Sequence, residues 1–399
     1  MIQVLTHFYI LLLKIAVFSA GTQNGSGNNM EILPGAWQTA GYFHLLEDKQ
    51  VAVAGNHTSM IQNTHLVDTL LASGINVVKV FSPEHGFRGK AADGEYVDDS
   101  TDPRTGIPIV SLYGSNRRPT RDQLADVDII LFDMQDVGTR FYTYISTMTY
   151  IMEESADKGI PVIILDRPNP NGHYVDGPIL EPDHASFVGL HPVPVVHGMT
   201  VGEYALMVNG EGWLKNDRSA DLRIVPVANY SRKMRYALPV APSPNLPNMH
   251  AVYLYPSLCF FEGTSISVGR GTPKPFQKFG HPDLPASAYQ HVFTPESRRE
   301  SPNPPQLGKE CRGQDLSRFN KEELKQKDRI NLGFLLEAYH HFPDKDEFFN
   351  PYFDQLAGTT ILREQIVAGY SASEIRAGWE EDLEAFRQLR ADYLLYPEQ

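Results

Sequence analysis

Five apolar runs of strand length recur along the first half of the chain, and polar or glycine-rich residues follow each of them. The runs occupy residues 51–55, 75–80, 107–112, 128–132 and 161–165. They are continuously apolar rather than alternating, which is typical of strands that are covered on both faces, as in parallel sheets. The pattern therefore predicts a buried, mostly parallel sheet.

Segments with helical spacing of apolar residues lie between these runs. We expect helices over residues 63–72 and 141–158, which glycines at 74 and 159 follow as stop signals, and a short one over 120–126. Alternating strands and helices predict an α/β fold with a doubly wound sheet and right-handed crossovers. The first run leads into Gly-Asn-His-Thr-Ser rather than G-x-G-x-x-G, so the dinucleotide fingerprint is absent.

The second half of the chain has a mixed pattern. Thr200 and Glu203 have the spacing of a helix-capping box. A strand is expected over 222–227 and helices over 332–342 and 373–393. The proline-rich segment 239–247 reads as a boundary or as a cleft wall. We therefore divide the chain into a Rossmann-like α/β domain over 30–244 and a smaller α+β domain over 245–399.

Composition and the N-terminal segment limit the classes of binding partner and the cellular locations that we expect. The chain has 399 residues, 42% of them hydrophobic, and a formal net charge of −13, so nucleic acid and anionic membrane surfaces are disfavoured as partners. Residues 8–20 resemble the apolar region of a secretory signal, so we expect residues 1–20 to be a signal peptide and the mature protein to be periplasmic or secreted. We expect no stable membrane insertion once this segment is removed. The two cysteines, Cys259 and Cys311, define no disulfide framework.

Glu84 is the first candidate for chemistry. It stands in Ser-Pro-Glu-His-Gly-Phe-Arg, directly after the second apolar run. Ligands of open α/β sheets bind outside the carboxyl ends of the strands. A carboxyl group placed there suits a general acid. The alternative is a carboxylate that pairs with His85 or Arg88 to hold the loop, and the residues alone support both interpretations equally.

A second polar group follows the run at 128–132. Asp133 and Asp136, with Arg140 nearby, suit sugar hydroxyls or a metal ion, although such a network also serves to fix a loop. Tyr142 and Tyr144 offer a sugar-stacking face, or pack at the start of a helix. Arg88, Arg140 and Arg270 are candidates for bidentate binding of an anionic group. The histidines show neither H-x-H nor H-E-x-x-H spacing, which disfavours a metal site.

Several of these segments together resemble the exo-β-N-acetylmuramidase family, a glycoside hydrolase family first catalogued as a domain of unknown function. The similar segments keep their order along the chain and are residues 55–59, 83–89, 105–114, 132–144, 166–170, 177–182 and 197–203. Beyond residue 275 the resemblance is one of general character.

The resemblance implies a Rossmann-like domain with a smaller partner domain, a site in the cleft between them, and no cofactor or metal. It implies release of terminal N-acetylmuramic acid (MurNAc) from the non-reducing end of peptidoglycan-derived muramyl saccharides. Glu84 matches the family's catalytic glutamate, and we assign Glu181, from its chemistry alone, as the second catalytic acid. The candidate substrate-binding residues are Asn56, His85, Arg88, Asp133, Asp136, Arg140, Tyr142, Tyr144 and Arg270.

The residues alone are compatible with two other functions. One is a periplasmic amino-sugar-binding protein without turnover, and the other is a metal-dependent hydrolase built on His57, His85, Asp133 and Asp136. For a glycosidase, the sequence does not choose among retaining, inverting and substrate-assisted mechanisms. It also indicates no oligomeric state. The lactyl carboxylate of MurNAc gives a reason for arginines in the pocket.

Overall fold

The computed structural model describes residues 30–84, 86–88, 99–114 and 116–398. Residues 32–399 form one compact unit. The expected signal peptide, residues 1–20, and the candidate residue His85 lie outside the described residues. Within the described ranges, no helix combines the length and the apolar character needed to cross a membrane.

A seven-stranded sheet forms the N-terminal half, in the order β11-β8-β7-β1-β4-β6-β5. Its strands are β1 (Val51–Gly55), β4 (Val77–Ser82), β5 (Ser100–Thr101), β6 (Pro108–Ser111), β7 (Ile129–Asp133), β8 (Val162–Leu165) and β11 (Leu222–Val225). All neighbouring pairs are parallel except β5 with β6. Along the chain, the parallel strands have the spatial order 3-2-1-4-5-6 of a Rossmann fold, so the predicted doubly wound sheet is confirmed.

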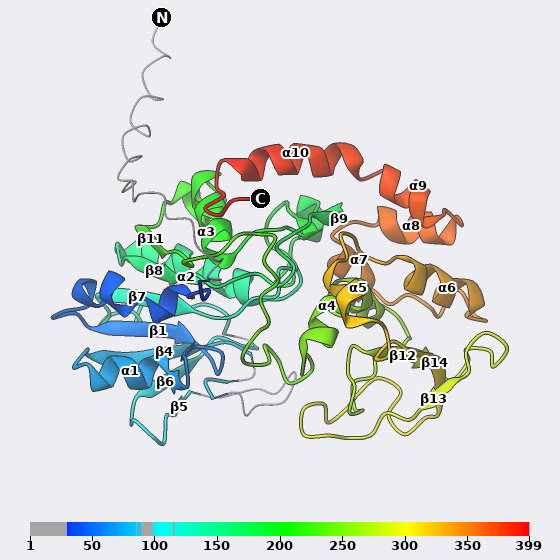
Figure 1. Ribbon diagram of the computed structural model, residues 1–399, viewed down its shortest axis with the longest axis horizontal. Coiled ribbons are helices and arrows are strands. Elements are labelled where there is room, and N and C mark those ends of the chain that lie inside the picture. Colours follow the sequence, from blue (N-terminus) through cyan, green and yellow to red (C-terminus); the bar gives the residue numbers. More distant parts are fainter. Residues whose placement is uncertain (1–29, 85, 89–98, 115, 399) are drawn as a thin grey trace, which may run out of the picture. The chain divides into compact units, whose positions relative to one another are not determined.

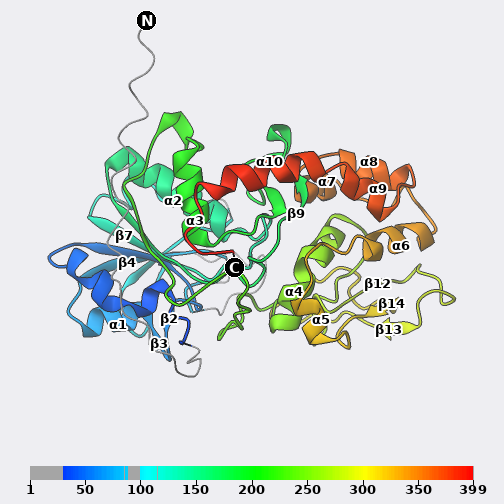
Figure 2. The ribbon, with the colours of Figure 1, turned by 45° about the horizontal axis from the view of Figure 1, so that its top comes forward.

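The continuous apolar runs have a direct structural cause, because both faces of this sheet are covered. Residues 52, 54, 130, 132, 162 and 164 face α2 (Tyr144–Lys158) and α3 (Val201–Gly210) in one core. Residues 51, 53, 129, 131, 163 and 165 face α1 (Leu66–Ala72) and the segment before β1 in another. Figure 2 shows α1 on one side of the sheet and α2 and α3 on the other.

Some helices begin or end at the capping residues that the sequence predicts, and others do not. Glycine 159, at φ +67°, ends α2 as expected, and Thr200 with Glu203 forms the predicted capping box of α3. A small hairpin, β2 (Met60–Ile61) with β3 (Thr64–His65), replaces the start of the first predicted helix. The predicted helix over 120–126 is wrong, since this segment forms only turns. A helix of seven residues makes few internal hydrogen bonds and depends on tertiary packing for its stability.

The C-terminal half adds a small antiparallel sheet and seven helices to the described part of the chain. The sheet has the order β12-β14-β13, with β12 (Lys278–His281), β13 (His291–Phe293) and β14 (Cys311–Asp315). The helices are α4 (Met249–Leu258), α5 (Lys321–Lys325), α6 (Gly333–His341), α7 (Tyr352–Ala357), α8 (Ile361–Val367), α9 (Ala372–Ala377) and α10 (Glu380–Ala391). The single helix predicted over 373–393 is thus two helices, separated at residues 378–379.

The last residues of the chain return to the large sheet. Figure 1 shows α10 running from α9 toward α3, and α10 packs against β9 (Asp176–Ile179), which pairs with β10 (Pro194–Val196). Beyond α10, Tyr396 donates a hydrogen bond to Asp166 at the end of β8, and the Leu395 amide donates to Glu203 at 2.7 Å. The two halves are therefore tied together by the C-terminal segment as well as at their junction.

Burial keeps several histidines neutral. The pKa of His197 falls to about 3 because the side chain is buried and because Arg390, Arg140 and Arg232 lie near it. Burial likewise lowers the pKa of His65 and of His191 to about 4. The Nδ1 atom of His197 accepts a hydrogen bond from the Met199 amide at 3.2 Å, which fixes the ring in its neutral form.

We expect a pH-dependent loss of stability from His197. The pKa of His197 is about 3 in the folded protein and about 6.5 in the unfolded chain. Between these two pH values only the unfolded chain takes up a proton on this side chain, so the free energy of unfolding falls as the pH falls. Between pH 7 and pH 5, wild type should lose about 2 kcal/mol more than His197→Asn, which keeps an acceptor for the Met199 amide. Urea titrations at several pH values measure this difference. Equal pH slopes in the two proteins would contradict it.

The comparison with the variant is needed because buried acids act in the opposite direction. Burial raises the pKa of Asp136 to about 7 and that of Asp166 to about 6. These folded values lie above the unfolded one, so acid adds stability through them. Both aspartates are present in wild type and in His197→Asn, and their contribution cancels in the difference.

Candidate active site

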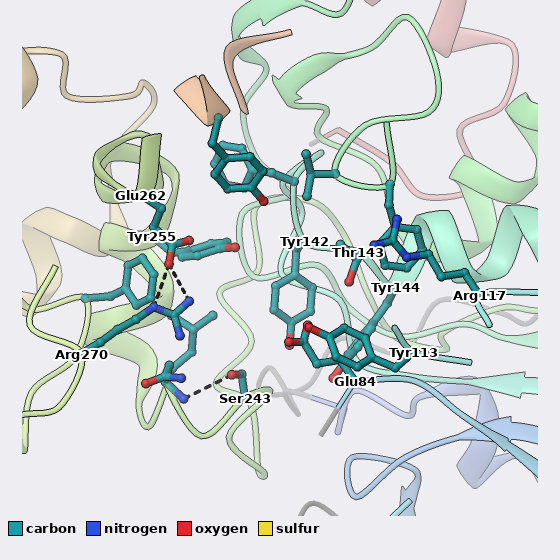
Figure 3. Close-up of a pocket in the computed structure, with 17 residues that line it drawn as sticks. Glu84, Tyr113, Arg117, Tyr142, Thr143, Tyr144, Ser243, Tyr255, Glu262 and Arg270 are labelled. Atoms are coloured by element: carbon teal, nitrogen blue, oxygen red, sulfur yellow. Dashed lines mark hydrogen bonds and ion pairs between the residues drawn. The ribbon is translucent and has the colours of Figure 1, made fainter. Parts of the chain in front are cut away.

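A cavity of about 340 Å³ lies at the carboxyl edge of the large sheet, where residues of both halves meet. The N-terminal half contributes Glu84 after β4, Tyr113 and Arg117 after β6, and the segment 141–144 before α2. The C-terminal half contributes Tyr255, Glu262, Arg270, Phe276 and Tyr352. Figure 3 shows these side chains converging on a common space. The cavity is at the small end of ligand pockets, which span about 300–1,000 Å³.

Glu84 reaches the cavity because the chain turns directly after β4. Pro83 precedes it, and the Gly86 amide donates a hydrogen bond to the Pro83 carbonyl at 3.2 Å. Gly86 has a φ of +72°, a conformation that side chains other than glycine rarely adopt, so the glycine of the motif is required by the turn. The sequence prediction that Glu84 lies at a strand end beside a ligand-sized space agrees with this geometry.

Two buried tyrosines form the wall next to Glu84. The rings of Tyr142 and Tyr144 meet edge to face, 4.8 Å apart, and both hydroxyl groups donate to the Pro242 carbonyl, at 2.7 and 3.4 Å. Burial raises the pKa of Tyr142 and of Tyr144, and the Glu84 charge adds to this effect. Both phenols therefore stay protonated. The structure brings these two predicted residues to the cavity, where their rings also serve packing.

A second carboxyl group faces the cavity from the C-terminal half. Glu262 lies in the 3₁₀ turn Cys259–Gly263 after α4, and Arg270 holds it through Nε and Nη2, at 2.7 and 2.6 Å from Oε1. The Cys259 thiol donates to Oε2 at 3.5 Å. Sequence reasoning missed Glu262 and singled out only its partner Arg270. The nearest sequence signal is an acid eight residues before the arginine of a Gly-Arg-Gly stretch, and the folded chain brings the two side chains together.

Between β1 and β7, where the strand order of the sheet reverses, side chains fill the space at the strand ends. Arg167 binds the Asp133 carboxylate at 2.6 and 2.9 Å, and both side chains are buried. Asp136 accepts from the Gly138 amide at 2.6 Å, and Asn56 accepts from the Thr58 amide at 2.9 Å. The structure does not place Asn56, Asp133 or Asp136 on the cavity wall, and their substrate-binding roles stay predictions.

Arg88 also lies outside the cavity wall. Its guanidinium group pairs with Asp102 at 2.7 Å and with Asp68 at 3.2 Å. Asp102 is buried, and Asp68 and Arg88 are partly exposed. These two ion pairs fix the loop after β4 through Asp68 and Asp102.

Arg140 is fully buried, and its side-chain hydrogen bonds to the described residues all go to backbone carbonyls. Its Nη1 atom donates to the carbonyls of residues 178 and 193, and its Nη2 atom donates to those of residues 356 and 357, all at 2.6–3.0 Å. Burial lowers its pKa to about 9. Gly358 makes room for it, since a Cβ atom there would lie 2.6 Å from Nη2. Arg140 thus joins β9 and β10 to the end of α7.

Glu181 contacts the same part of the chain, the segment directly after α7, from the protein surface. Its amide donates to the Gly358 carbonyl at 2.8 Å, and its carboxylate accepts from the Thr359 hydroxyl at 2.7 Å. The side chain is exposed and does not line the cavity. Glu181 is thus not among the residues that line the cavity with Glu84, and its assignment as the second catalytic acid stays a prediction.

The described ranges contain no cluster of side chains that could coordinate a metal ion. No three side chains of histidine, cysteine, aspartate or glutamate converge there as ligands would. Asp133 is taken up by Arg167, and the Nε2 atom of His57 lies 2.8 Å from the Ala241 carbonyl. The metal-hydrolase hypothesis also named His85, which lies outside the described residues.

Comparisons with solved structures support the fold. A crystal structure of a DUF1343 family protein from Bacteroides fragilis NCTC 9343 is 49% identical, with a TM-score of 0.85, and the match covers 92% of this chain and 100% of that chain. A second DUF1343 family crystal structure from the same strain is 30% identical, with a TM-score of 0.77, covering 92% and 99%.

Comparisons with protein families cover both halves of the chain. The model for the N-terminal part of the exo-β-N-acetylmuramidase NamZ matches residues 51–250, and that for its C-terminal part matches residues 253–396. The peptidoglycan β-N-acetylmuramidase NamZ of Bacillus subtilis (strain 168) is 38% identical over 382 residues, which are 88% of this chain and 90% of that protein. The chain therefore belongs to the exo-β-N-acetylmuramidase NamZ family.

Proposed function

We propose that this protein is an exo-acting glycoside hydrolase that releases terminal MurNAc from the non-reducing end of peptidoglycan fragments, with Glu84 and Glu262 as its two carboxyl groups. The observation that carries the residue assignment is their placement. Each comes from a different half of the chain, and both line one cavity. Hydrolysis of a glycosidic bond usually uses two carboxyl groups that flank the bond.

The surroundings of the two acids suit different roles. Glu262 is ion-paired with Arg270, which favours a carboxylate that remains charged beside the sugar. Glu84 has the aromatic neighbours Tyr142 and Tyr144, and such surroundings suit the acid that protonates the leaving oxygen. The small cavity volume suits a single terminal sugar and therefore release from the chain end.

The place of action follows from the substrate. Peptidoglycan lies outside the cytoplasmic membrane, and the apolar run at residues 8–20 resembles an export signal. We therefore propose export to the periplasm or the medium, with muramyl saccharides as the partners of the cavity.

The test is the release of MurNAc from the disaccharide in which it is β-linked to N-acetylglucosamine. We expect wild type to release MurNAc from the non-reducing end, and Glu262→Gln to be at least about 100-fold slower, because loss of one of two catalytic carboxyl groups typically costs 100- to 10,000-fold. Chromatography of the products follows both sugars. Glu47→Gln is the matched control, since this glutamate is exposed and makes no side-chain hydrogen bond or ion pair with the described residues.

Two results would overturn parts of this proposal. A wild-type protein that binds MurNAc but leaves the disaccharide intact would make it a sugar-binding protein. A Glu262→Gln variant with the wild-type rate would remove Glu262 from the catalytic pair and leave the activity itself standing.

A further inference from the structure

MurNAc differs from N-acetylglucosamine by a lactyl ether that ends in a carboxylate. A site that selects the muramyl sugar needs a cation for this group, and arginine is the side chain that best matches a carboxylate. The three arginines that the sequence suggested for this role are engaged elsewhere. Arg88 pairs with two aspartates, Arg140 binds backbone carbonyls, and Arg270 pairs with Glu262.

Arg117 lines the same cavity and has no carboxylate partner among the described residues. It lies in the loop after β6, and its Nε atom donates to the Gly114 carbonyl at 3.1 Å. This bond fixes the inner end of the guanidinium group, while Nη1 and Nη2 have no hydrogen-bond partner in the described part of the chain. Figure 3 shows Arg117 reaching the cavity from the side opposite to Glu262 and Arg270.

A column of stacked side chains holds Arg117 in place. Its guanidinium carbon lies 4.4 Å from the centre of the Phe187 ring, and Phe187 also lines the cavity. Phe187 stacks on Tyr150 of α2, with ring centres 5.9 Å apart and an interplanar angle of 25°. Arg118 lies over Tyr150 at 3.7 Å and pairs with Glu153. Stacking on an aromatic face orients a guanidinium group but leaves its edge free for a carboxylate.

We propose that Arg117, supported by Phe187, binds the lactyl carboxylate of the terminal muramyl sugar and so determines the preference of the enzyme for MurNAc. The assignment rests on the proposed function of the cavity. The assignment places the acids and the specificity cation at different parts of one cavity. Glu84 and Glu262 then act on the glycosidic bond, and Arg117 contacts a substituent that takes no part in bond cleavage.

The experiment compares two chromogenic substrates, 4-nitrophenyl β-MurNAc and its lactyl carboxamide. The two differ only in the charge of the lactyl group. We expect wild type to prefer the carboxylate by about 10- to 100-fold in kcat/KM, the usual range for a hydrogen-bonded charge. Arg117→Gln should reduce this preference to less than about 3-fold and should leave the carboxamide rate nearly unchanged. Arg117→Lys should retain part of the preference, and Phe187→Leu should weaken it.

The matched control is Arg121→Gln, four residues along the chain, which removes an exposed arginine that makes no side-chain hydrogen bond or ion pair with the described residues. It should keep the wild-type preference. An Arg117→Gln variant that still prefers the carboxylate, or that loses both rates equally, would overturn the assignment. If wild type cleaves neither substrate, the proposed function fails, and calorimetric binding of MurNAc and N-acetylglucosamine to wild type and Arg117→Gln then decides the role of Arg117.

Discussion

Replacing Glu84 by glutamine is expected to lower kcat for the MurNAc disaccharide by about 100- to 10,000-fold, the usual contribution of a general acid. Glutamine keeps the size of the side chain but has no acidic proton to give to the leaving oxygen. The turn that carries residue 84 depends on Pro83 and Gly86, so the fold should persist. Steady-state kinetics with the disaccharide measure the loss.

The leaving group distinguishes an acid from a nucleophile. A dinitrophenyl group departs with little protonation, so Glu84→Gln should lose much less activity on a dinitrophenyl muramide than on the disaccharide. Glu181→Gln should stay close to wild type on both, because the Glu181 side chain lies outside the cavity. Equal losses for the two substrates would reject the role of Glu84 as the acid, and an inactive Glu181→Gln would restore Glu181 as a candidate.

Replacing Arg140 by leucine is expected to lower the free energy of unfolding by about 4 kcal/mol or more. Four backbone carbonyls lose their donor, and each buried acceptor left unpaired costs about 1–3 kcal/mol. Relief of the buried charge offsets part of this cost. Because the carbonyls come from both halves of the chain, the junction that forms the cavity should loosen. Urea unfolding followed by circular dichroism measures the change.

Arg121→Leu is the matched control for this substitution, and it should unfold at nearly the wild-type urea concentration. The preference for the lactyl carboxylate over the carboxamide should persist in whatever folded Arg140→Leu remains. A variant of wild-type stability that has lost this preference would show that Arg140 binds substrate, as the sequence suggested.

The sheet could be predicted because its signal is local. Runs such as 129–132 and 162–165 are apolar at every position, and this pattern has few explanations other than a strand covered on both faces. Glu84 could be placed for the same reason, since it directly follows β4 and parallel strands end at a common edge. Here the position along the strand determines the position in space.

The rest of the site depends on contacts between distant parts of the chain. Asp133 and Arg140 also follow a strand, but Arg167 and the carbonyls of residues 356 and 357 turn them inward. Glu262 belongs to a turn beyond α4, and only the packing of the two halves brings it opposite Glu84. Nothing in the local sequence distinguishes an arginine that binds backbone, such as Arg140, from one that faces a cavity, such as Arg117.

A structure of the Glu84→Gln variant with the intact MurNAc disaccharide tests the central claim most directly. We expect the muramyl ring to lie in the 340 Å³ cavity, with the glycosidic oxygen beside residue 84. Glu262 should contact the same sugar, and Arg117 should bind its lactyl carboxylate. A disaccharide bound elsewhere, or one whose glycosidic oxygen lies away from residue 84, would contradict it.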